Sequence, residues 1–309
     1  MPMNIEKVFL TGKEVLTDKN RRILFFAFHG FYDYMDDEAF IRKVYQARMG
    51  KVLNLDNPRT FNEKLQWLKI HNRKPEYTIM VDKYEVKKYV SNIIGEEHII
   101  PTLGVWDRFD DIDFDLLPKQ FVLKCTHDSG GLLICRDKDK FDFKTAKKKM
   151  NHFMKHDYFL QNREWPYKNV KHRIIAEKYM ENTISGQLCD YKFFCFDGKV
   201  KCMKVDFDRF IEHHANYFDE NGNLLYFGET ICPPIYERKI VFPDNIDKMK
   251  KFAEKLTVGQ PFLRADFYDV DGEVYFGELT FYPASGMGSF TSEEWDYQLG
   301  EWIKLPGMA

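Results

Sequence analysis

The sequence predicts an α+β protein, because helical periodicity fills its N-terminal part and strand pairs around tight turns fill most of the remainder. The N-terminal 95 residues carry several stretches with apolar residues at helical spacing. After them, short apolar runs alternate with turns that contain Gly and Asp, which is the pattern of antiparallel hairpins. The most informative of these hairpins spans residues 262–281.

Length, charge and cysteine usage exclude several classes of protein. The chain has 309 residues, enough for two domains or for one domain with subdomains, and a net charge of −2 that gives no bulk attraction to nucleic acid. No apolar run approaches the roughly 20 residues that span a bilayer, and no signal-peptide pattern is visible. The six cysteines lack metal or CxxC spacing. We therefore expect a cytoplasmic protein with buried thiols, no nucleic-acid partner and no transmembrane segment.

The N-terminal part predicts a series of amphipathic helices. One covers residues 39–48 after an acidic stretch, with basic residues towards its end. Another lies within 57–69 and has a capping box, Thr60 with Glu63 three residues later. A third runs from about residue 77 to residue 90. No internal repeat or low-complexity linker interrupts them.

A Gly-rich turn between two strands is the first candidate for a binding site. The strand Phe121–Cys125 carries Lys124 as its only charge, and Thr126-His-Asp-Ser-Gly-Gly131 follows it. Such a turn presents backbone N–H groups with little obstruction, as phosphate oxygens require, and Lys124 adds a point charge. Taken alone, an ordinary hairpin turn explains the stretch better. His127 is expected to be a loop residue or substrate neighbour, because no second His or Cys stands at metal-ligand spacing.

The next segments supply further strands and a helix. The aromatic stretch 158–167 predicts a loop that acts as a lid. A strand over 173–180 carries Glu177 and Lys178, and a strand pair over 190–207 places Lys192 on the same face as Asp190. Arg209 follows the second strand of that pair. His213 and His214 are not a metal pair, since neighbouring residues of a strand point to opposite faces. A helix over 243–256, with Asp244 as its cap, precedes the C-terminal hairpin.

The C-terminal hairpin gathers acidic groups on one face. Its strands flank an Asp-Gly turn, and Arg264 and Asp266 lie on the face opposite to the apolar residues. On the returning strand, Phe276, Glu278 and Thr280 share a face because side chains repeat every two residues. Two neighbouring carboxylates repel one another unless a cation lies between them, and Mg²⁺ suits such oxygen ligands. The alternative is an antiparallel pair with a charged, solvated face.

Taken together, these pieces resemble ATP-grasp enzymes. The similarity is closest to the TupA-like branch, which is associated with teichuronopeptide and other bacterial surface-polysaccharide biosynthesis. Four phrases carry it: TFNEKLQWL at 60–68, EWPYKN at 164–169, DYKFFCF at 190–196 and GELTFYP at 277–283. The resemblance covers most of the chain from about residue 40 onwards.

The resemblance implies an ATP-grasp fold, in which two α+β subdomains clasp a nucleotide. The implied division is a helical N-terminal region at 1–95, a small subdomain at 96–180 and a large subdomain at 181–309 that holds the metal-binding hairpin. The Rossmann-like domain that usually precedes the two subdomains is not evident, because the first 95 residues are predicted to be helical.

The resemblance also implies the roles of individual residues. The implied ATP-binding residues are Lys124, Thr126, His127, Ser129, Gly130, Gly131, Glu177, Lys178, Tyr179 and Lys192, of which Glu177 to Tyr179 would form the hinge beside adenine. Mg²⁺ would be held by Asp266, Glu278 and Thr280, where many family members carry Asn in place of the threonine. Catalytic roles fall to Arg264, Lys192 and Arg209.

The implied activity is an ATP- and Mg²⁺-dependent carboxylate–amine ligase that works through an acyl-phosphate. The substrates would be a small-molecule or glycan carboxylate and an amine, such as a sugar acid of a surface polysaccharide and an amino acid. Two alternatives stay open. A glycosyltransferase would use a DxD triplet, which occurs weakly at 206–208 and 269–271. A nucleotide-binding module without turnover would be consistent with Thr280 at the metal site.

Overall fold

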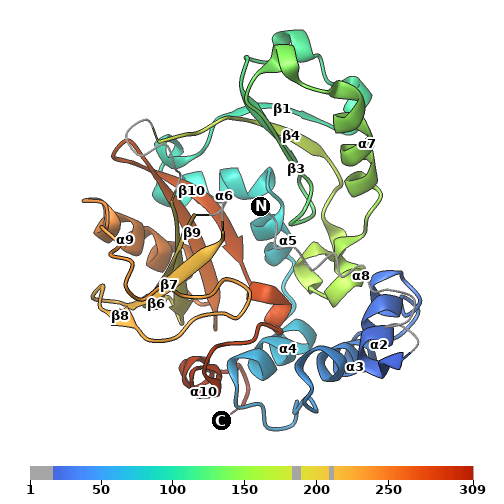
Figure 1. Cartoon of the computed structure of the whole chain (residues 1–309), viewed down its shortest axis with the longest axis vertical. Helices are drawn as coiled ribbons and strands as arrows, with labels where there is room; N and C mark the ends of the chain where they lie inside the picture. The colour runs from blue at the N-terminus through green and yellow to red at the C-terminus, as the bar shows by residue number, and fades with distance from the viewer. Residues whose placement is uncertain (1–16, 183–188, 209–211, 309) are drawn as a thin grey trace.

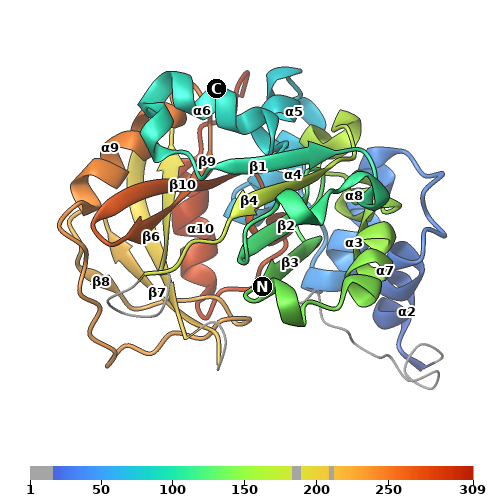
Figure 2. The same cartoon turned by 90° about the horizontal axis from the view of Figure 1, so that it is seen from above.

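The computed structural model describes residues 17–182, 189–208 and 212–308, in which two antiparallel sheets form separate layers. In Figure 1 the smaller sheet lies at the top and the larger sheet at the left, while the N-terminal helices α2–α4 lie at the bottom. Figure 2 gives the view from above. Among the described residues, no helix is long and apolar enough to cross a membrane. All six cysteines are free, as expected.

The N-terminal region is helical, as the sequence predicts. Its helices are α2 (Lys19–Phe28), α3 (Asp37–Met49), α4 (Phe61–His71), α5 (Glu76–Val81) and α6 (Glu85–Ile94). The capping box of α4 is confirmed: Thr60 Oγ1 accepts from the Glu63 amide, and the Glu63 carboxylate accepts from the Thr60 amide.

The small sheet has the strand order β1-β4-β2-β3, with every pair antiparallel. Its strands are β1 (Thr102–Trp106), β2 (Phe121–Cys125), β3 (Leu132–Cys135) and β4 (Ile174–Lys178). Helix α7 (Phe143–Met154) covers one face and shares a core with β2 and β4. The predicted loop over 158–167 is instead folded into α8 (Tyr158–Asn162) and the 3-10 turn η5 (Trp165–Asn169), so its lid role has no structural support.

The large sheet has the order β10-β9-β5-β6-β7-β8. Its strands are β5 (Asp190–Phe196), β6 (Lys199–Phe207), β7 (His214–Asp219), β8 (Leu224–Leu225), β9 (Leu263–Val270) and β10 (Glu273–Thr280). Helix α9 (Ile246–Leu256) packs on β5, β6 and β9. It begins later than predicted: Asn245 is its N-cap residue rather than Asp244, and no side chain caps it.

The N-terminal helices share one core with the large sheet. Phe40, Leu65 and Val90 of helices α3, α4 and α6 belong to the same buried cluster as Phe193 of β5 and Phe267 of β9. The small sheet and α7 form a second, smaller cluster. Since helical stability in proteins comes mostly from packing an apolar face, these helices depend on the large sheet. The subdomain boundaries at residues 95 and 180 remain predictions.

The hairpin β9–β10 has the predicted turn but contains a bulge. Glu278 pairs with Asp266, whereas Phe276 pairs with Phe267, so Gly277 is an extra residue in the ladder. The prediction that Phe276 shares a face with Glu278 is therefore wrong. Phe276 is buried with Phe267, because the extra residue shifts the alternation by one.

Helix α10 (Glu293–Trp302) docks on α4 through close backbone contacts. The Asn62 amide and side chain both donate to Asp296 Oδ1 at 3.0 Å. Lys64 Nζ donates to the carbonyls of Gly300 and Ile303, each at 2.8 Å. A Cβ at Gly300 would overlap the carbonyl oxygen of Arg59, so this position requires glycine for close approach.

We expect Gly300→Ala to lower the free energy of unfolding by about 2 kcal/mol, because the added methyl forces α10 away from α4. Urea unfolding at neutral pH measures the change. Glu294→Ala, an exposed site on the same helix, is the matched control and should be nearly neutral. Equal stability of the two variants would contradict the close packing.

Candidate functional site

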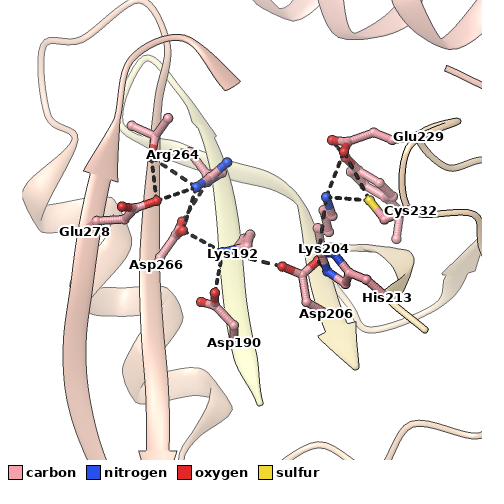
Figure 3. A network of polar contacts seen from close by, with 12 residues as sticks. Asp190, Lys192, Lys204, Asp206, His213, Glu229, Cys232, Arg264, Asp266 and Glu278 are labelled. Atoms are coloured by element: carbon pink, nitrogen blue, oxygen red, sulfur yellow. Dashed lines mark hydrogen bonds and ion pairs between the residues drawn. The ribbon is translucent and has the colours of Figure 1, made fainter. Parts of the chain in front are cut away.

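Polar side chains, most of them charged, come from four neighbouring strands of the large sheet and gather on one face (Figure 3). They come from β10, β9, β5 and β6 in that order across the sheet: Glu278 and Thr280; Arg264 and Asp266; Asp190 and Lys192; Lys204 and Asp206. Side chains of one strand face repeat every two residues, so each strand contributes a pair. The pairing of β5 with β9, in which Lys192 lies opposite Asp266, places the predicted catalytic and metal-binding residues of the hairpin beside Lys192.

Arg264 joins the three residues predicted to hold a metal. Its Nε donates to Asp266 Oδ1 at 2.7 Å, and its Nη2 lies 2.6 Å from Asp266 Oδ2 and 2.9 Å from Glu278 Oε1. The same Nη2 lies 3.0 Å from Thr280 Oγ1. Burial alone would lower the pKa of Arg264, but the Asp266 and Glu278 carboxylates outweigh it and raise the pKa. Two carboxylates and a hydroxyl therefore converge on one cationic nitrogen.

This donor set fits a shared Mg²⁺ site. Among the described residues, no group of three or more His, Cys, Asp or Glu side chains is placed to hold a metal by itself. Proteins usually hold Mg²⁺ by one or two carboxylates together with phosphate oxygens and water. Asp266, Glu278 and the neutral Thr280 hydroxyl match that arrangement, and the Glu278 side chain is 50% exposed and therefore accessible to a ligand.

Lys192 is the counter-charge of three aspartates. Its Nζ lies 2.5 Å from Asp190 Oδ2, 2.8 Å from Asp266 Oδ2 and 3.6 Å from Asp206 Oδ2. Burial would lower the pKa of Lys192, but the three carboxylates raise it, so the ammonium stays charged. Arg209, also predicted to be catalytic, lies outside the described residues.

A second cluster of polar side chains surrounds Lys204 and shares Asp206 with the first. No pattern in the sequence predicts it. Lys204 Nζ lies 3.6 Å from Asp206 Oδ1, 2.8 Å from Glu229 Oε2 and 3.2 Å from Cys232 Sγ. Tyr217 donates its hydroxyl proton to Glu229 Oε1 at 2.7 Å. Glu229 and Cys232 lie in an irregular segment after β8, so no periodicity signal connects them to β6. All five side chains are buried.

The turn between β2 and β3 is held by its own side chains. Both Asp128 carboxylate oxygens lie 2.9 Å from the Gly131 amide nitrogen. A Cβ at Gly131 would lie 2.7 Å from Cys125 Sγ, so glycine is required there. Thr126 Oγ1 donates to the Lys171 carbonyl at 2.8 Å, and Ser129 Oγ lies 3.1 Å from the Tyr158 hydroxyl. Side-chain hydrogen bonds within the turn and to its neighbours therefore fix its shape.

His127 is a buried residue of this turn. Its Nε2 lies 3.2 Å from the Phe153 carbonyl, in the last turn of α7, and 3.1 Å from the His156 carbonyl just after that helix. Its ring stacks on His172 with centroids 3.6 Å apart. Burial lowers the pKa of His127 to about 4, so the imidazole is neutral. These contacts give His127 a scaffolding role that its place in the turn does not suggest.

Glu177 pairs with two lysines. Its Oε2 lies 2.5 Å from Lys124 Nζ and its Oε1 lies 2.5 Å from Lys87 Nζ. Burial would raise the pKa of Glu177, but both ammonium groups outweigh it and lower the pKa to about 2. The structure thus brings Lys124 and Glu177 together, and it adds Lys87 from α6.

The sequence does not predict that Lys83 and Lys87 of the N-terminal region reach this site, because charged residues of amphipathic helices normally face solvent. Lys83 lies between α5 and α6, and its Nζ donates to the Asp128 carbonyl of the Gly-rich turn. The Lys83 amide donates to the Thr126 carbonyl at 3.1 Å. Lys83 thus brings one cation from the N-terminal region to the predicted phosphate site, whereas Lys87 reaches Glu177 beside it.

The remaining hinge residues are Lys178, at the end of β4, and Tyr179, which follows that strand. Lys178 and Tyr179 line a pocket of about 600 Å³ with Lys119, Gln120 and Arg136, among others. Because alternate residues of a strand point to opposite faces, Lys178 does not share the face of Glu177. Contacts between this segment and adenine remain a prediction.

A strained turn follows β10. Ala284 and Ser285 have positive φ angles of 48° and 57°, which non-glycine residues rarely adopt. Ser285 is held at both ends: its Oγ donates to Glu164 Oε1 at 2.6 Å, and its carbonyl accepts from Lys69 Nζ at 2.7 Å. Burial lowers the pKa of Lys69 to about 8, although Glu164 opposes this effect. Such strain persists only where the surroundings determine the conformation, often beside functional sites.

Glu177 should contribute about 3 kcal/mol to stability at neutral pH, because its pKa falls from 4.5 in the unfolded chain to about 2 in the folded chain. A lowered pKa stabilises above the unfolded value and loses this effect as the pH falls through the folded value. We therefore expect the stability difference between the wild type and Glu177→Gln to shrink as the pH falls below 4.5. Urea unfolding between pH 7 and pH 3 measures it.

The exposed Glu181→Gln is the control for this experiment and should follow the wild type throughout the pH range. A difference between the wild type and Glu177→Gln that stays constant or widens in acid would contradict the paired state of Glu177.

A protein-family model for TupA-like ATP-grasp proteins matches residues 63–304. No curated protein matches the chain. Among similar solved structures, D-alanine–D-alanine ligase from Bacillus anthracis is 18% identical with a TM-score of 0.40, over 73% of this chain and 66% of that chain. The Helicobacter pylori D-alanine–D-alanine ligase is 13% identical with a TM-score of 0.40, over 79% and 69%.

The ATP-grasp ligase PsnB, in a complex with Mg and ADP, is 10% identical with a TM-score of 0.40, over 71% of this chain and 57% of that chain. The chain thus spans about two thirds or less of the length of the first structures that it resembles. We draw no activity from likeness at this level. The family model covers most of the chain in one continuous match, and it agrees with the two-sheet architecture and the charged hairpin. The chain belongs to the TupA-like ATP-grasp family.

Proposed function

We propose that the chain is an ATP- and Mg²⁺-dependent carboxylate–amine ligase. The observation that carries this proposal is the convergence of Asp266, Glu278 and Thr280 on one nitrogen of Arg264. Family membership supports it, since the three residues stand where the ATP-grasp resemblance expects metal ligands. Mg²⁺ bound there would draw phosphate oxygens to the hairpin and neutralise their charge.

The small sheet would hold the nucleotide in this proposal. Lys124 supplies positive charge to the phosphates, and the preorganised turn 126–131 supplies backbone N–H groups. Lys83 adds a second cation, because its ammonium already lies at the Asp128 carbonyl. Glu177 to Tyr179 form the hinge beside adenine.

The chemistry that follows has two steps. A substrate carboxylate oxygen attacks the γ-phosphorus of ATP, and the bond from that phosphorus to the β-phosphate oxygen breaks. ADP departs, and the substrate now carries the phosphoryl group as an acyl-phosphate. An amine nitrogen then attacks the acyl carbon, inorganic phosphate leaves, and the amine loses a proton. Arg264 steadies the transferred phosphoryl group, and Lys192 fixes the carboxylates around it. Arg209 remains a predicted catalytic residue.

For the substrates, we propose an amino acid as the amine and a sugar acid of a bacterial surface polysaccharide as the carboxylate. The resemblance to the TupA-like branch is the support for this pairing. The glycosyltransferase alternative has no favourable observation. Asp206 is buried between Lys192 and Lys204, and Asp269 accepts hydrogen bonds from Asn245 and from the Gly272 amide of the hairpin turn.

A thermal-shift measurement with MgATP tests the nucleotide and metal site. Ligand at ~100 times its dissociation constant should stabilise the wild type by roughly 2.7 kcal/mol. We expect Asp266→Asn and Glu278→Gln to lose the Mg²⁺-dependent part of the shift, because each removes a carboxylate ligand. Glu273→Gln, on the exposed part of the same hairpin, is the control and should respond like the wild type.

Three other outcomes would change the proposal. A shift with a nucleotide sugar but none with MgATP would move the assignment to glycosyl transfer. MgATP binding without phosphate release, across a screen of sugar acids with amino acids, would favour a binding module without turnover. An equal Mg²⁺-dependent shift in both carboxylate variants would place the metal elsewhere.

A further inference from the structure

Polar contacts from one short segment connect the two buried cores. Val86 and Val90 of α6 belong to the large core, whereas β2 and β4 build the small core. Residues 82–87 nevertheless reach the small sheet at several points. Asp82 lies 2.8 Å from Arg173 beside β4, and Lys87 pairs with Glu177. The segment therefore anchors the small sheet on the larger body.

The Lys87 contact involves a residue of the proposed nucleotide site. Each oxygen of the Glu177 carboxylate has its own lysine, Lys124 on one and Lys87 on the other. The Glu177 side chain is 6% exposed, Lys87 12% and Lys124 24%, so Lys124 is the partner that solvent and ligands reach most easily. Lys87 is further fixed by donating to the Ile100 carbonyl at 2.6 Å.

Nucleotide binding by Lys124 would disturb its ion pair with Glu177. Lys124 can turn towards a phosphate only by weakening its bond to Glu177. A buried carboxylate left without a partner is strongly destabilising, by several kcal/mol where such pairs have been broken. Lys87 prevents that cost, because it keeps one oxygen of Glu177 paired while Lys124 moves.

We propose that Lys87 is a positioning residue for nucleotide binding, which holds the Glu177 carboxylate so that Lys124 is free to engage the phosphates of ATP. This inference rests on the proposed role of Lys124. It extends the nucleotide site to helix α6 of the N-terminal region. Lys87 itself does not contact the phosphates in this proposal. Without Lys87, Glu177 would retain Lys124 and compete with the nucleotide.

The test measures binding of Mg²⁺ with the non-hydrolysable analogue adenosine 5′-(β,γ-imido)triphosphate by titration calorimetry. We expect Lys87→Met to weaken binding about tenfold, the equivalent of one lost charge-assisted contact. Lys87→Arg should bind within about twofold of the wild type, because it keeps the charge. Lys88→Met, on the exposed face of α6, is the matched control and should bind like the wild type.

The decisive comparison adds Glu177→Gln to Lys87→Met. If Glu177 retains Lys124 when Lys87 is lost, removing the charge of Glu177 releases Lys124. The double variant should then bind as tightly as Glu177→Gln alone, a comparison that cancels any contact of Glu177 itself with the nucleotide. A merely structural role of Lys87 would leave the double variant about tenfold weaker than Glu177→Gln. Wild-type affinity in Lys87→Met, or that tenfold loss in the Glu177→Gln background, would overturn the inference.

Lys124→Met separates this inference from the proposed function. No binding by the wild type would overturn both. Binding by the wild type that is lost in Lys124→Met would support the nucleotide site, and the Lys87 series then decides the inference alone. Equal binding by the wild type and Lys124→Met would remove the role of Lys124 and overturn the inference as well.

Discussion

The site depends on the repulsion between carboxylates that one sheet face forces together. Asp190, Asp206 and Asp266 are almost fully buried and lie on neighbouring strands, so each needs a cation within a few ångströms. Lys192 and Arg264 supply that charge from the same strands. Their positions follow from strand alternation, and the bulge at Gly277 brings Glu278 opposite Asp266. A site of this kind is suited to a divalent cation, because charge compensation is its organising feature.

The N-terminal helices are part of the site rather than an appendage to it. They complete the core of the large sheet, and three lysines of this region point towards functional groups instead of solvent. Lys83 reaches the Gly-rich turn, Lys87 reaches Glu177, and Lys69 holds the strained turn after β10. Lys83 and Lys87 therefore join the helical region to the small sheet and its Gly-rich turn, and Lys69 joins it to the turn after the large-sheet strand β10. Such desolvated charges cost stability unless they are paired, so their partners must be placed accurately.

The strained turn shows how this accuracy is obtained. Ser285 adopts a left-handed conformation that costs of order 1–3 kcal/mol. Glu164 holds Ser285 through the serine hydroxyl, and Lys69 holds it through the serine carbonyl. The turn begins a few residues after Thr280 at the end of β10. Its geometry is therefore determined by α4 and by the segment after α8, which lie far from it in sequence.

The sequence by itself determined the helical N-terminal region, the strand pairs, the capping box at Thr60 and the turn of the β9–β10 hairpin, because these depend on contacts within about ten residues. It also located Arg264, Asp266, Glu278 and Thr280 on one surface by period-two alternation. Only the tertiary structure decided which face Phe276 takes, since one extra residue at the bulge reverses the alternation. It also decided the partners of Lys87, Lys69 and Lys204, because those contacts join segments whose separation in sequence carries no periodic signal.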